Sequence, residues 1–466
     1  MQFSILSATL VAGILLTSCK VGPAYLKPDV ADITPAAWKW QSTAPRDATP
    51  RGEWWTVFHD DQLNRLEKQA VAGNQELRGA LARLDQARAF VGASSAAYSP
   101  EISLQAAAKR EKTSGNPPSP VPIPIPAAQI NSFNVPLVLS YELDLWGRVR
   151  RSVESAKASA ESATADYHSV LLSLTGDVAA NYFLLRSLDA ELAALRKTLG
   201  SQEKTITLIE QRFKAGTIAE ADLAKARSEI ATSKADLADV KRQREETINV
   251  LALLCGQPAS NFTLTERPIA GTPPKIPAGL PSSLLERRPD VASAERNVAA
   301  RNADIGVAVA GYFPAVSLTG QAGFLSKETT GLFSAATTVW SVGPSVSQPL
   351  TGIFLTKAKV ASAKARREEA IATYRQTVLG AIKDVETSLA QIRYRKEQSV
   401  AQDEAVAAAA KATELTRQRY ESGAISYLEL LDAERTSLAR ERLAAQVRAQ
   451  GHIATVRLIR ALGGAW

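Results

Sequence analysis

The chain contains the same segment twice, and this duplication limits what it can fold into. QRFKAGTIAEADLAKA begins at Gln211, and QRYESGAISYLELLDA begins 207 positions later at Gln418. The two copies align without a gap to Gly256 and Gly463. Further upstream AAYSPEISLQA aligns with AGYFPAVSLTG at an offset of 214, and the seven extra residues lie in a Pro-rich loop between the two regions. The chain is therefore two copies of one unit, which differ mainly in one loop.

Each unit changes its hydrophobic pattern from helical to alternating and back again. In the first unit residues 74–97 have helical spacing, and alternation begins after Pro100. The alternation predicts two strands in each unit, each about ten residues long, which suits a tilted strand that crosses a bilayer. We expect these strands at about 101–110, 132–144, 315–325 and 338–350.

A long helical stretch follows the strands of each unit. Residues 148–214 contain no Pro, and their apolar residues recur at the steps of three, four and seven that form a coiled-coil seam. These 67 residues would extend for about 100 Å at about 1.5 Å per residue. A Gly-containing turn at 214–218 ends this helix, and a second helix of 36 residues follows. The second unit repeats the pattern with 355–421 and a turn at 421–425.

In each unit the long helix is about as long as the two shorter helices placed end to end. Each unit therefore supplies two helical columns of similar length, one continuous and one in two pieces. One chain supplies four strands, too few to close a β-barrel, whereas three chains supply twelve and leave room for an aqueous passage. We therefore expect a homotrimer. The expected domains are 1–18 (signal peptide), 19–72 (acylated N-terminal segment and equatorial part), 73–257 (first repeat), 258–281 (equatorial linker) and 282–466 (second repeat).

The N-terminus predicts secretion and lipid attachment. Phe3 to Leu16 is apolar, of signal-peptide length and too short to span a bilayer. It leads into LTSC, which resembles the lipobox that is cut before a cysteine whose thiol is then acylated. We expect a covalent N-acyl and diacylglycerol lipid on Cys19 and no other cofactor, and Lys20 at the next position favours the outer membrane. The alternative is an ordinary signal peptide with an incidental cysteine. Cys255 is expected to be a buried structural thiol.

Composition and motifs argue against several functions. The net charge of +8, from 55 basic and 47 acidic residues, is spread along the chain, without the run of Lys or Arg typical of a nucleic-acid arm. His59, His168 and His452 are isolated in the sequence, so we expect no metal site. The sequence has neither a phosphate-binding glycine loop nor a nucleophile elbow, so we expect no enzyme.

Six segments follow one another in an order that is specific as a set. They are CKVGPAYLKP, WWTVFHDDQLNRL, LSYELDLWGRVR, LPSSLLERRPDVASAERNVAARNADIGVA, RYESGAISYLELLDAERT and ALGGAW. Together they resemble the outer-membrane factors of tripartite efflux pumps, the TolC-like family, and most closely its RND-type lipoprotein branch. The resemblance covers the whole chain. It implies a mainly α fold with a membrane β-barrel, in which three chains form a twelve-strand barrel and a twelve-helix periplasmic tunnel.

The resemblance also implies a function and partners. The chain would be a passive exit duct in the bacterial outer membrane, lipid-anchored and extending into the periplasm. Solutes would be expelled through it by an inner-membrane RND-type transporter, by way of a periplasmic adaptor (membrane fusion protein). The two helix–turn–helix tips would open when the adaptor docks. The alternative is a periplasmic coiled-coil structural or adaptor lipoprotein without a pore.

The resemblance places a periplasmic gate at these tips. Glu429 and Asp432 stand three residues apart on one helix face, and threefold repetition would ring the closed pore with carboxylates. Asp222 is the first-repeat counterpart of Glu429, and Tyr420 aligns with a tip aromatic that makes a link in the family. Ile425 stands where some members carry a basic residue, so the intersubunit salt bridge made there by those members is not expected.

Other readings of these residues stay open. Glu429 and Asp432 can instead form a solvated helix face, with Asp432 paired to Arg435. Trp146 and Trp340 are candidates for the membrane interface, although Trp146 can equally pack into a core at a strand end. The tip turns and the candidate adaptor contacts are Gly216, Thr217, Gly423, Ala424 and Ser426.

Overall fold

The computed structural model describes residues 20–40, 52–114, 127–269, 271–279, 281 and 287–464. The chain divides into two compact units. Unit 1 comprises the residues up to 28 together with 84–163 and 294–373, and unit 2 comprises 29–83, 164–293 and the residues from 374 onward. The expected signal peptide 1–18 and the expected acylation site Cys19 lie outside the described residues.

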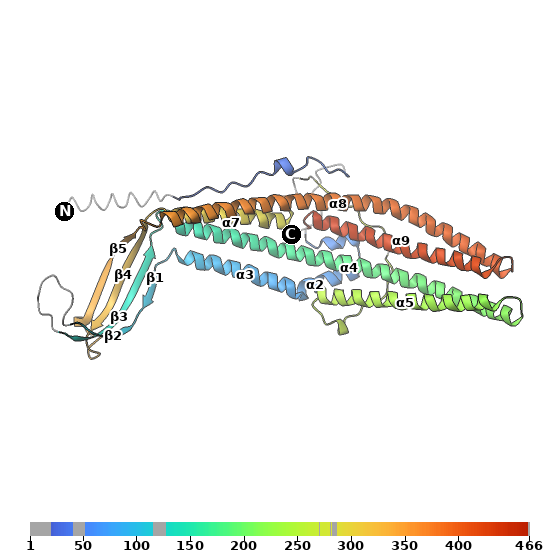
Figure 1. Cartoon of the computed structure of the whole chain (residues 1–466), viewed down its shortest axis with the longest axis horizontal. Helices are drawn as coiled ribbons and strands as arrows, with labels where there is room; N and C mark the ends of the chain where they lie inside the picture. The colour runs from blue at the N-terminus through green and yellow to red at the C-terminus, as the bar shows by residue number, and fades with distance from the viewer. Residues whose placement is uncertain are drawn as a thin grey trace. The chain divides into compact units, whose positions relative to one another are not determined.

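The described part of unit 1 contains an antiparallel sheet of five strands (Figure 1). Both β1 and β2 pair with β3, β3 pairs with β4, and β4 pairs with β5. The pairing of β3 with β4 joins a strand of the first repeat to a strand of the second. The strands are β1 (Glu101–Leu104), β2 (Ala107–Lys112), β3 (Gln129–Glu142), β4 (Ala315–Ser326) and β5 (Thr338–Ser347).

The register of the sheet collects apolar side chains on one face and mostly polar ones on the other. Residues that lie directly opposite each other on paired strands point to the same face. The row Leu104, Leu137, Ala322 and Trp340 is apolar, and the neighbouring row Ser103, Val138, Gln321 and Ser341 is mostly polar. The apolar face continues with Ile102, Leu139, Val342, Val316 and Val346, and the polar face with Ser140, Thr319, Ser317 and Ser345.

The strand predicted at about 101–110 is divided into β1 and β2. The interruption at Gln105 and Ala106 lies opposite Pro136, which has no N–H group to donate to the neighbouring strand. One half of the pairing remains, because the backbone N–H of Gln105 donates to the carbonyl of Pro136 at 3.0 Å. On the other side of β3, Gly323 allows β4 to approach Pro136, since a Cβ on Gly323 would lie 2.4 Å from the Pro136 Cα.

The long helices have the lengths that the sequence pattern predicts. α4 (Arg148–Lys214) has 67 residues, and α8 (Ile353–Glu421) has 69, two more than expected at its start. Each is followed by a helix of 35 residues, α5 (Glu220–Leu254) and α9 (Tyr427–Ala461). The strands of each repeat are preceded by helices of 22 residues, α3 (Gln75–Ala96) and α7 (Pro289–Ala310). The remaining elements are α2 (Asp61–Gly73), η1 (Ala31–Ile33), η2 (Trp54–Phe58), η3 (Ala259–Asn261) and η5 (Ala335–Thr337).

Unit 2 contains the larger part of two helical hairpins, whose long helices begin in unit 1, and the short elements that pack on them. α4 and α5 form the first hairpin, and α8 and α9 form the second (Figure 1). The largest apolar cluster gathers where α2 and η2 meet α4, α5 and α9, and it includes Trp54, Leu63, Tyr182, Leu251 and Ile459. Cys255 is buried in this cluster, and burial raises the pKa of its thiol to about 11. None of the described helices combines the length and the apolarity needed to cross a membrane.

Candidate functional site

Both hairpins end in the same type of turn. At the first tip the N–H of Thr217 donates to the carbonyl of Arg212 at 3.0 Å, and Gly216 adopts a positive φ of 72°. At the second tip the N–H of Ala424 donates to the carbonyl of Arg419 at 2.9 Å, and Gly423 has a φ of 81°. These are Schellman turns, which satisfy the last carbonyls of a helix and need a residue in the left-handed region. Thr217, Ala424 and Ser426 are exposed at these turns.

Alanine at either tip glycine is expected to loosen its turn. No atom lies within 4 Å of a Cβ added at Gly216 or Gly423, so the cost is backbone strain at positive φ, about 1–2 kcal/mol. Hydrogen exchange of the amides around the turn should become faster in Gly423→Ala. The matched control is Gly380→Ala, in the middle of α8, where a Cβ also meets nothing and alanine should stabilise the helix by about 0.5–1 kcal/mol. Equal exchange rates at the tip of Gly423→Ala and of the parent protein would contradict this explanation.

An apolar cluster holds the two tips of one chain together. Tyr420 is 3% exposed and packs against Tyr427, with ring centroids 5.9 Å apart. The guanidinium of Arg212 lies over the Tyr420 ring at 5.0 Å. Arg212 also donates to the carbonyls of Tyr420 and Glu421, at 3.2 and 2.8 Å. Tyr420, one of the predicted gate residues, therefore faces the inside of its own chain. The rest of the cluster consists of Ile209, Leu223, Ala226, Leu430 and Leu431.

The three predicted gate carboxylates lie at the starts of α5 and α9. Glu429 and Asp432 are both exposed, as a gate that faces a pore requires. Glu429 also accepts the backbone N–H of Ser426 at 3.3 Å, which is half of a capping box. The spacing Ser-x-x-Glu is the sequence signal for this cap. Asp222 lies 3.9 Å from Lys225 on the same helix.

Arg435 pairs with a different carboxylate from the one expected on a solvated helix face. Its guanidinium contacts Glu229 of the first hairpin, with Nε 3.0 Å from a carboxylate oxygen. Arg417 makes a second ion pair, at 2.8 Å from Glu434. Both Glu229 and Glu434 are buried, and burial raises the pKa of Glu434. The sequence did not single out Glu229 or Glu434, because in the sequence each resembles the exposed carboxylates of its helix.

The two predicted interface tryptophans lie in different surroundings. Trp340 on β5 is 75% exposed on the apolar face of the sheet, where a membrane-facing ring would lie. Trp146 stacks on Phe313, with ring centroids 4.6 Å apart. Its indole N–H donates to the carbonyl of Pro314 at 2.8 Å. Trp146 therefore packs where β3 leads into α4, as the alternative interpretation of this residue expects.

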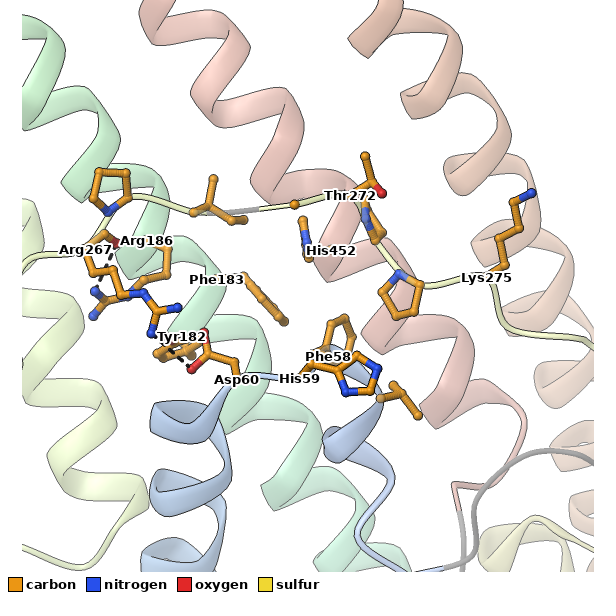
Figure 2. A pocket seen from close by; sticks show the side chains of 16 residues that line it. Phe58, His59, Asp60, Tyr182, Phe183, Arg186, Arg267, Thr272, Lys275 and His452 are labelled. Carbon is orange, nitrogen blue, oxygen red and sulfur yellow. Dashed lines mark hydrogen bonds and ion pairs between the residues drawn. The ribbon is translucent and has the colours of Figure 1, made fainter.

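A pocket of about 470 Å³ opens in unit 2 beside η2 and the start of α2 (Figure 2). Asp60 caps α2 by accepting the N–H groups of Gln62 and Leu63, at 2.9 and 3.2 Å. It also accepts the hydroxyl proton of Tyr182 at 2.7 Å. The pocket is lined by Phe58, His59, Phe183, Arg267, Lys275 and His452 among others. Among the described residues, no three His, Cys, Asp or Glu side chains gather as a metal site would require.

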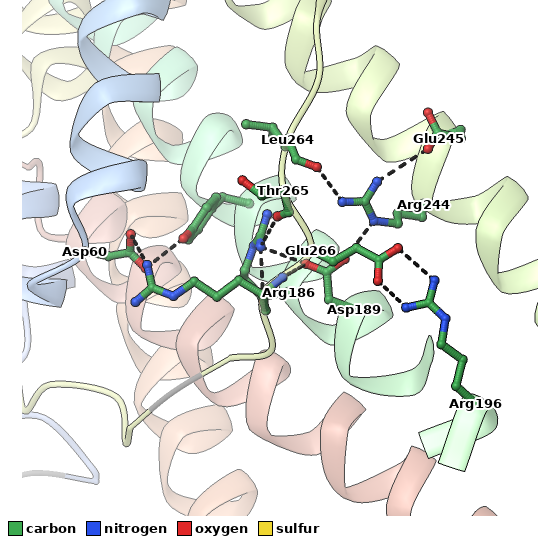
Figure 3. A network of polar contacts seen from close by, with 11 residues as sticks. Asp60, Arg186, Asp189, Arg196, Arg244, Glu245, Leu264, Thr265 and Glu266 are labelled. Carbon is green, nitrogen blue, oxygen red and sulfur yellow. Dashed lines mark hydrogen bonds and ion pairs between the residues drawn. The ribbon is translucent and has the colours of Figure 1, made fainter. Parts of the chain in front are cut away.

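A buried ion cluster beside this pocket ties the linker to the first hairpin (Figure 3). Asp189 is fully buried and lies 2.7 Å from Arg186 and 2.8 Å from Arg244. It also accepts the backbone N–H of Arg267 at 2.9 Å. Arg244 in turn donates to the carbonyl of Leu264 at 2.6 Å. One carboxylate thus joins α4, α5 and the segment that connects the two repeats.

The sequence and the fold both match known proteins. The family model of outer membrane efflux proteins matches residues 66–257 and 280–464, two ranges that overlap the expected repeats 73–257 and 282–466. Outer membrane protein OprJ of Pseudomonas aeruginosa is 33% identical over 99% of this chain and 95% of its own length. The solvent efflux pump outer membrane protein SrpC of Pseudomonas putida is 32% identical over 99% of this chain and 98% of its own length. The solved structure of the outer-membrane channel OprN superposes with a TM-score of 0.87 at 33% identity, and the match covers 96% of this chain and 100% of that one.

A duplicated unit with two long helical hairpins and a two-faced sheet is the architecture of an outer-membrane channel. The chain belongs to the outer membrane efflux protein family. It is the outer-membrane channel of an efflux system, and the mainly helical, duplicated fold predicted from the sequence is confirmed. The expected location in the bacterial outer membrane is confirmed as well.

Proposed function

We propose that three copies of the chain assemble around one axis and form a passive duct through the outer membrane. The observation that carries this proposal is the division of the sheet into an apolar and a polar face. Leu104, Leu137 and Trp340 would face lipid, and Gln321 and Ser341 would line the water-filled side. The outer edges of the sheet offer unpaired backbone groups, so the sheets of neighbouring copies can continue one another.

The energy and the choice of cargo come from partners. We propose a periplasmic adaptor that docks on the exposed tip residues, such as Thr217 and Ala424, and an inner-membrane RND-type transporter behind it. The relatives are channels and not enzymes, which fits a duct that performs no reaction itself. We also propose that a lipid on Cys19 anchors the N-terminus in the outer membrane. The relative SrpC is named for solvent efflux. The polar face of the sheet in this chain is suited to water, and we expect it to discriminate little among solutes.

The gate is proposed to be the ring of carboxylates at the tips. Glu429→Gln together with Asp432→Asn removes the charges, while glutamine keeps the capping hydrogen bond to Ser426. In planar bilayers we expect the resting open probability to rise by about tenfold, a shift of about 1.4 kcal/mol, and the cation preference to fall.

The control for this double variant is Glu245→Gln, because Glu245 is an exposed carboxylate on α5 outside the turn. Unchanged conductance in both variants would remove Glu429 and Asp432 from the gate. A parent protein that conducts no ions at all would overturn the duct itself.

A further inference from the structure

A cavity of about 660 Å³ opens between α8 and α9 in unit 2, next to the pocket of Figure 2. Residues 271–275 of the linker and His452 line both cavities and therefore separate them. The linker can pass close to α9 because Gly451 has no side chain, and a Cβ there would lie 3.3 Å from Cγ of Pro273. The cavity has the size of sites that hold small organic ligands.

The wall of this cavity is mostly apolar. Leu389 and Leu458 line it and belong to a buried apolar cluster, against which Ile276 of the linker packs. Val400 of α8 also lines the cavity and is 55% exposed, and Trp40 completes the wall from the N-terminal segment. A hydrocarbon chain that enters the cavity would remove its own surface and that of these side chains from water, which is favourable.

The charged side chains around the cavity are mostly basic. Among the described residues that line it, five are basic and one, Asp403, is acidic. The carboxylate of Asp403 already lies 2.6 Å from the guanidinium of Arg448, so it does not neutralise the other cations. The cavity thus combines an apolar wall with an excess of positive charge. The five basic residues are Lys275, Arg393, Arg395, Lys396 and Arg448.

Two of these cations come from different elements that border the cavity. Lys275 lies on the linker and Lys396 on α8, and both are exposed. Arg393 contacts Glu397 at 3.4 Å, but both partners of this pair are exposed, so it is screened by water and salt. A carboxylate at the cavity would therefore meet a positive potential from two elements, whereas an ammonium group would be repelled.

The linker forms one wall of the cavity without tying its backbone to the helices there. In the described part of the chain no backbone hydrogen bond involves residues 271–276. The linker is held on either side instead: Arg186 donates to the carbonyl of Arg267 at 3.1 Å, and the indole N–H of Trp38 donates to the carbonyl of Gly279 at 3.0 Å. This wall can therefore adjust to a ligand without a loss of backbone hydrogen bonds.

We propose that this cavity binds a single-chain anionic amphiphile of the fatty-acid type. The carboxylate of the ligand is drawn to Lys275 and Lys396, and its hydrocarbon chain packs on the apolar wall beside Trp40. The ligand thereby joins α8, α9 and the linker between the two repeats. All the residues that line the cavity belong to unit 2 of one chain, so the proposal goes beyond the duct and does not depend on the assembly or the gate.

Quenching of tryptophan fluorescence tests the binding directly. The full chain, in nanodiscs of phosphatidylcholine, is titrated with dodecanoate brominated at the end of its chain, because bromine quenches a nearby indole ring. We expect saturable quenching that is smaller in Trp40→Phe, the variant that identifies the signal of Trp40. Unlabelled dodecanoate should reverse the quenching, and decanoate should compete about 15-fold less well, because each buried methylene contributes about fourfold in affinity. Equal quenching of the parent protein and Trp40→Phe would overturn the site.

Charge variants test the recognition of the carboxylate. Lys275→Gln together with Lys396→Gln is expected to weaken dodecanoate binding about fivefold and to leave the binding of uncharged dodecanol unchanged. The matched control is Lys204→Gln together with Lys411→Gln, two exposed lysines on α4 and α8 that do not line the cavity. An unchanged affinity for dodecanoate in the first variant, or equal affinity of the parent protein for dodecyltrimethylammonium, would overturn the anionic ligand.

A larger side chain tests the cavity itself. Ser399→Phe should fill the cavity from α8 and abolish the quenching, because Ser399 lines the cavity. The control is Ala401→Phe, which adds the same ring at an exposed position of α8 outside the lining. Circular dichroism checks that both variants fold. Binding by Ser399→Phe as strong as that by the parent protein would overturn this cavity as the site. Loss of dodecanoate binding in nanodiscs that contain phosphatidylglycerol would assign the cavity to a two-chain lipid and overturn the single-chain ligand.

Discussion

Asp189→Ala should lower the free energy of unfolding by about 3–5 kcal/mol, the largest effect that we expect from any single substitution in this chain. The alanine leaves the guanidinium groups of Arg186 and Arg244 buried without the carboxylate that lies 2.7 and 2.8 Å from them. Burying an unpaired charge costs more than the lost ion pair itself. It also frees the backbone N–H of Arg267, so the linker loses one of its hydrogen bonds to α4, while Arg186 still donates to the carbonyls of Thr265 and Arg267. Urea denaturation of the purified full-length protein, followed by circular dichroism, measures the change.

Two further variants make this prediction specific. Asp85→Ala is the matched control, because Asp85 pairs with Arg88 at 3.4 Å on an exposed helix surface and should matter little. Asp189→Asn keeps the shape and removes the charge, and it remains measurable if the alanine variant does not fold. If Asp189→Asn lowers the free energy of unfolding by no more than Asp85→Ala does, the ion cluster contributes little to stability.

Glu67→Gln should remove a dependence of stability on pH. Glu67 is fully buried in α2, and neither carboxylate oxygen has a partner among the described residues. Burial raises the pKa of Glu67 well above its ordinary value of 4.5, so the folded protein keeps the proton. The unfolded chain releases that proton above pH 4.5, and the parent protein should therefore lose stability as the pH rises from 4.5 toward the raised pKa of the folded state. Glutamine cannot ionise, so the variant should show a flatter profile.

The destabilisation that Glu67 causes is measured at high pH, by comparing the parent protein with a variant that has an apolar side chain at this position. At pH 8 Glu67→Met is expected to be more stable than the parent protein by about 1–3 kcal/mol, the cost of leaving a buried polar group unpaired. Glu76→Gln is the control, since Glu76 is an exposed carboxylate in the first turn of α3. Identical pH profiles for the parent and Glu67→Gln would show that Glu67 is not the group that titrates.

The helical part of the fold could be predicted from the sequence because it depends on local signals. The absence of Pro and the heptad-like spacing placed α4 at 148–214, and the structure begins and ends the helix at those residues. The tip turns followed from Gly216 and Gly423, which take the positive φ that their turns need. The strands were predicted nearly as well, but the break between β1 and β2 was missed, since it depends on Pro136 in the partner strand.

Contacts between distant segments were the part that the sequence could not supply. Asp189 and Arg244 are 55 positions apart, and each sits in a helix rich in charged residues. Which charges become buried depends on how α4, α5 and the linker pack together. The same holds for Tyr420, which alignment placed at the gate and which packing directs into its own chain. Whether Glu429 and Asp432 close the pore stays a prediction that conductance will decide.

Lys197 of the first hairpin pairs with Glu441 of the second at 2.9 Å, and their counterparts in the other repeat are Glu404 and Lys234, with the charges exchanged. Two first hairpins side by side would set Lys197 against Lys234, and two second hairpins would set Glu404 against Glu441. At this position each half is attracted to the other kind and repelled by its own. If several copies assemble around one axis, this position favours unlike halves side by side, and a chain that carried one half twice would lose the attraction there.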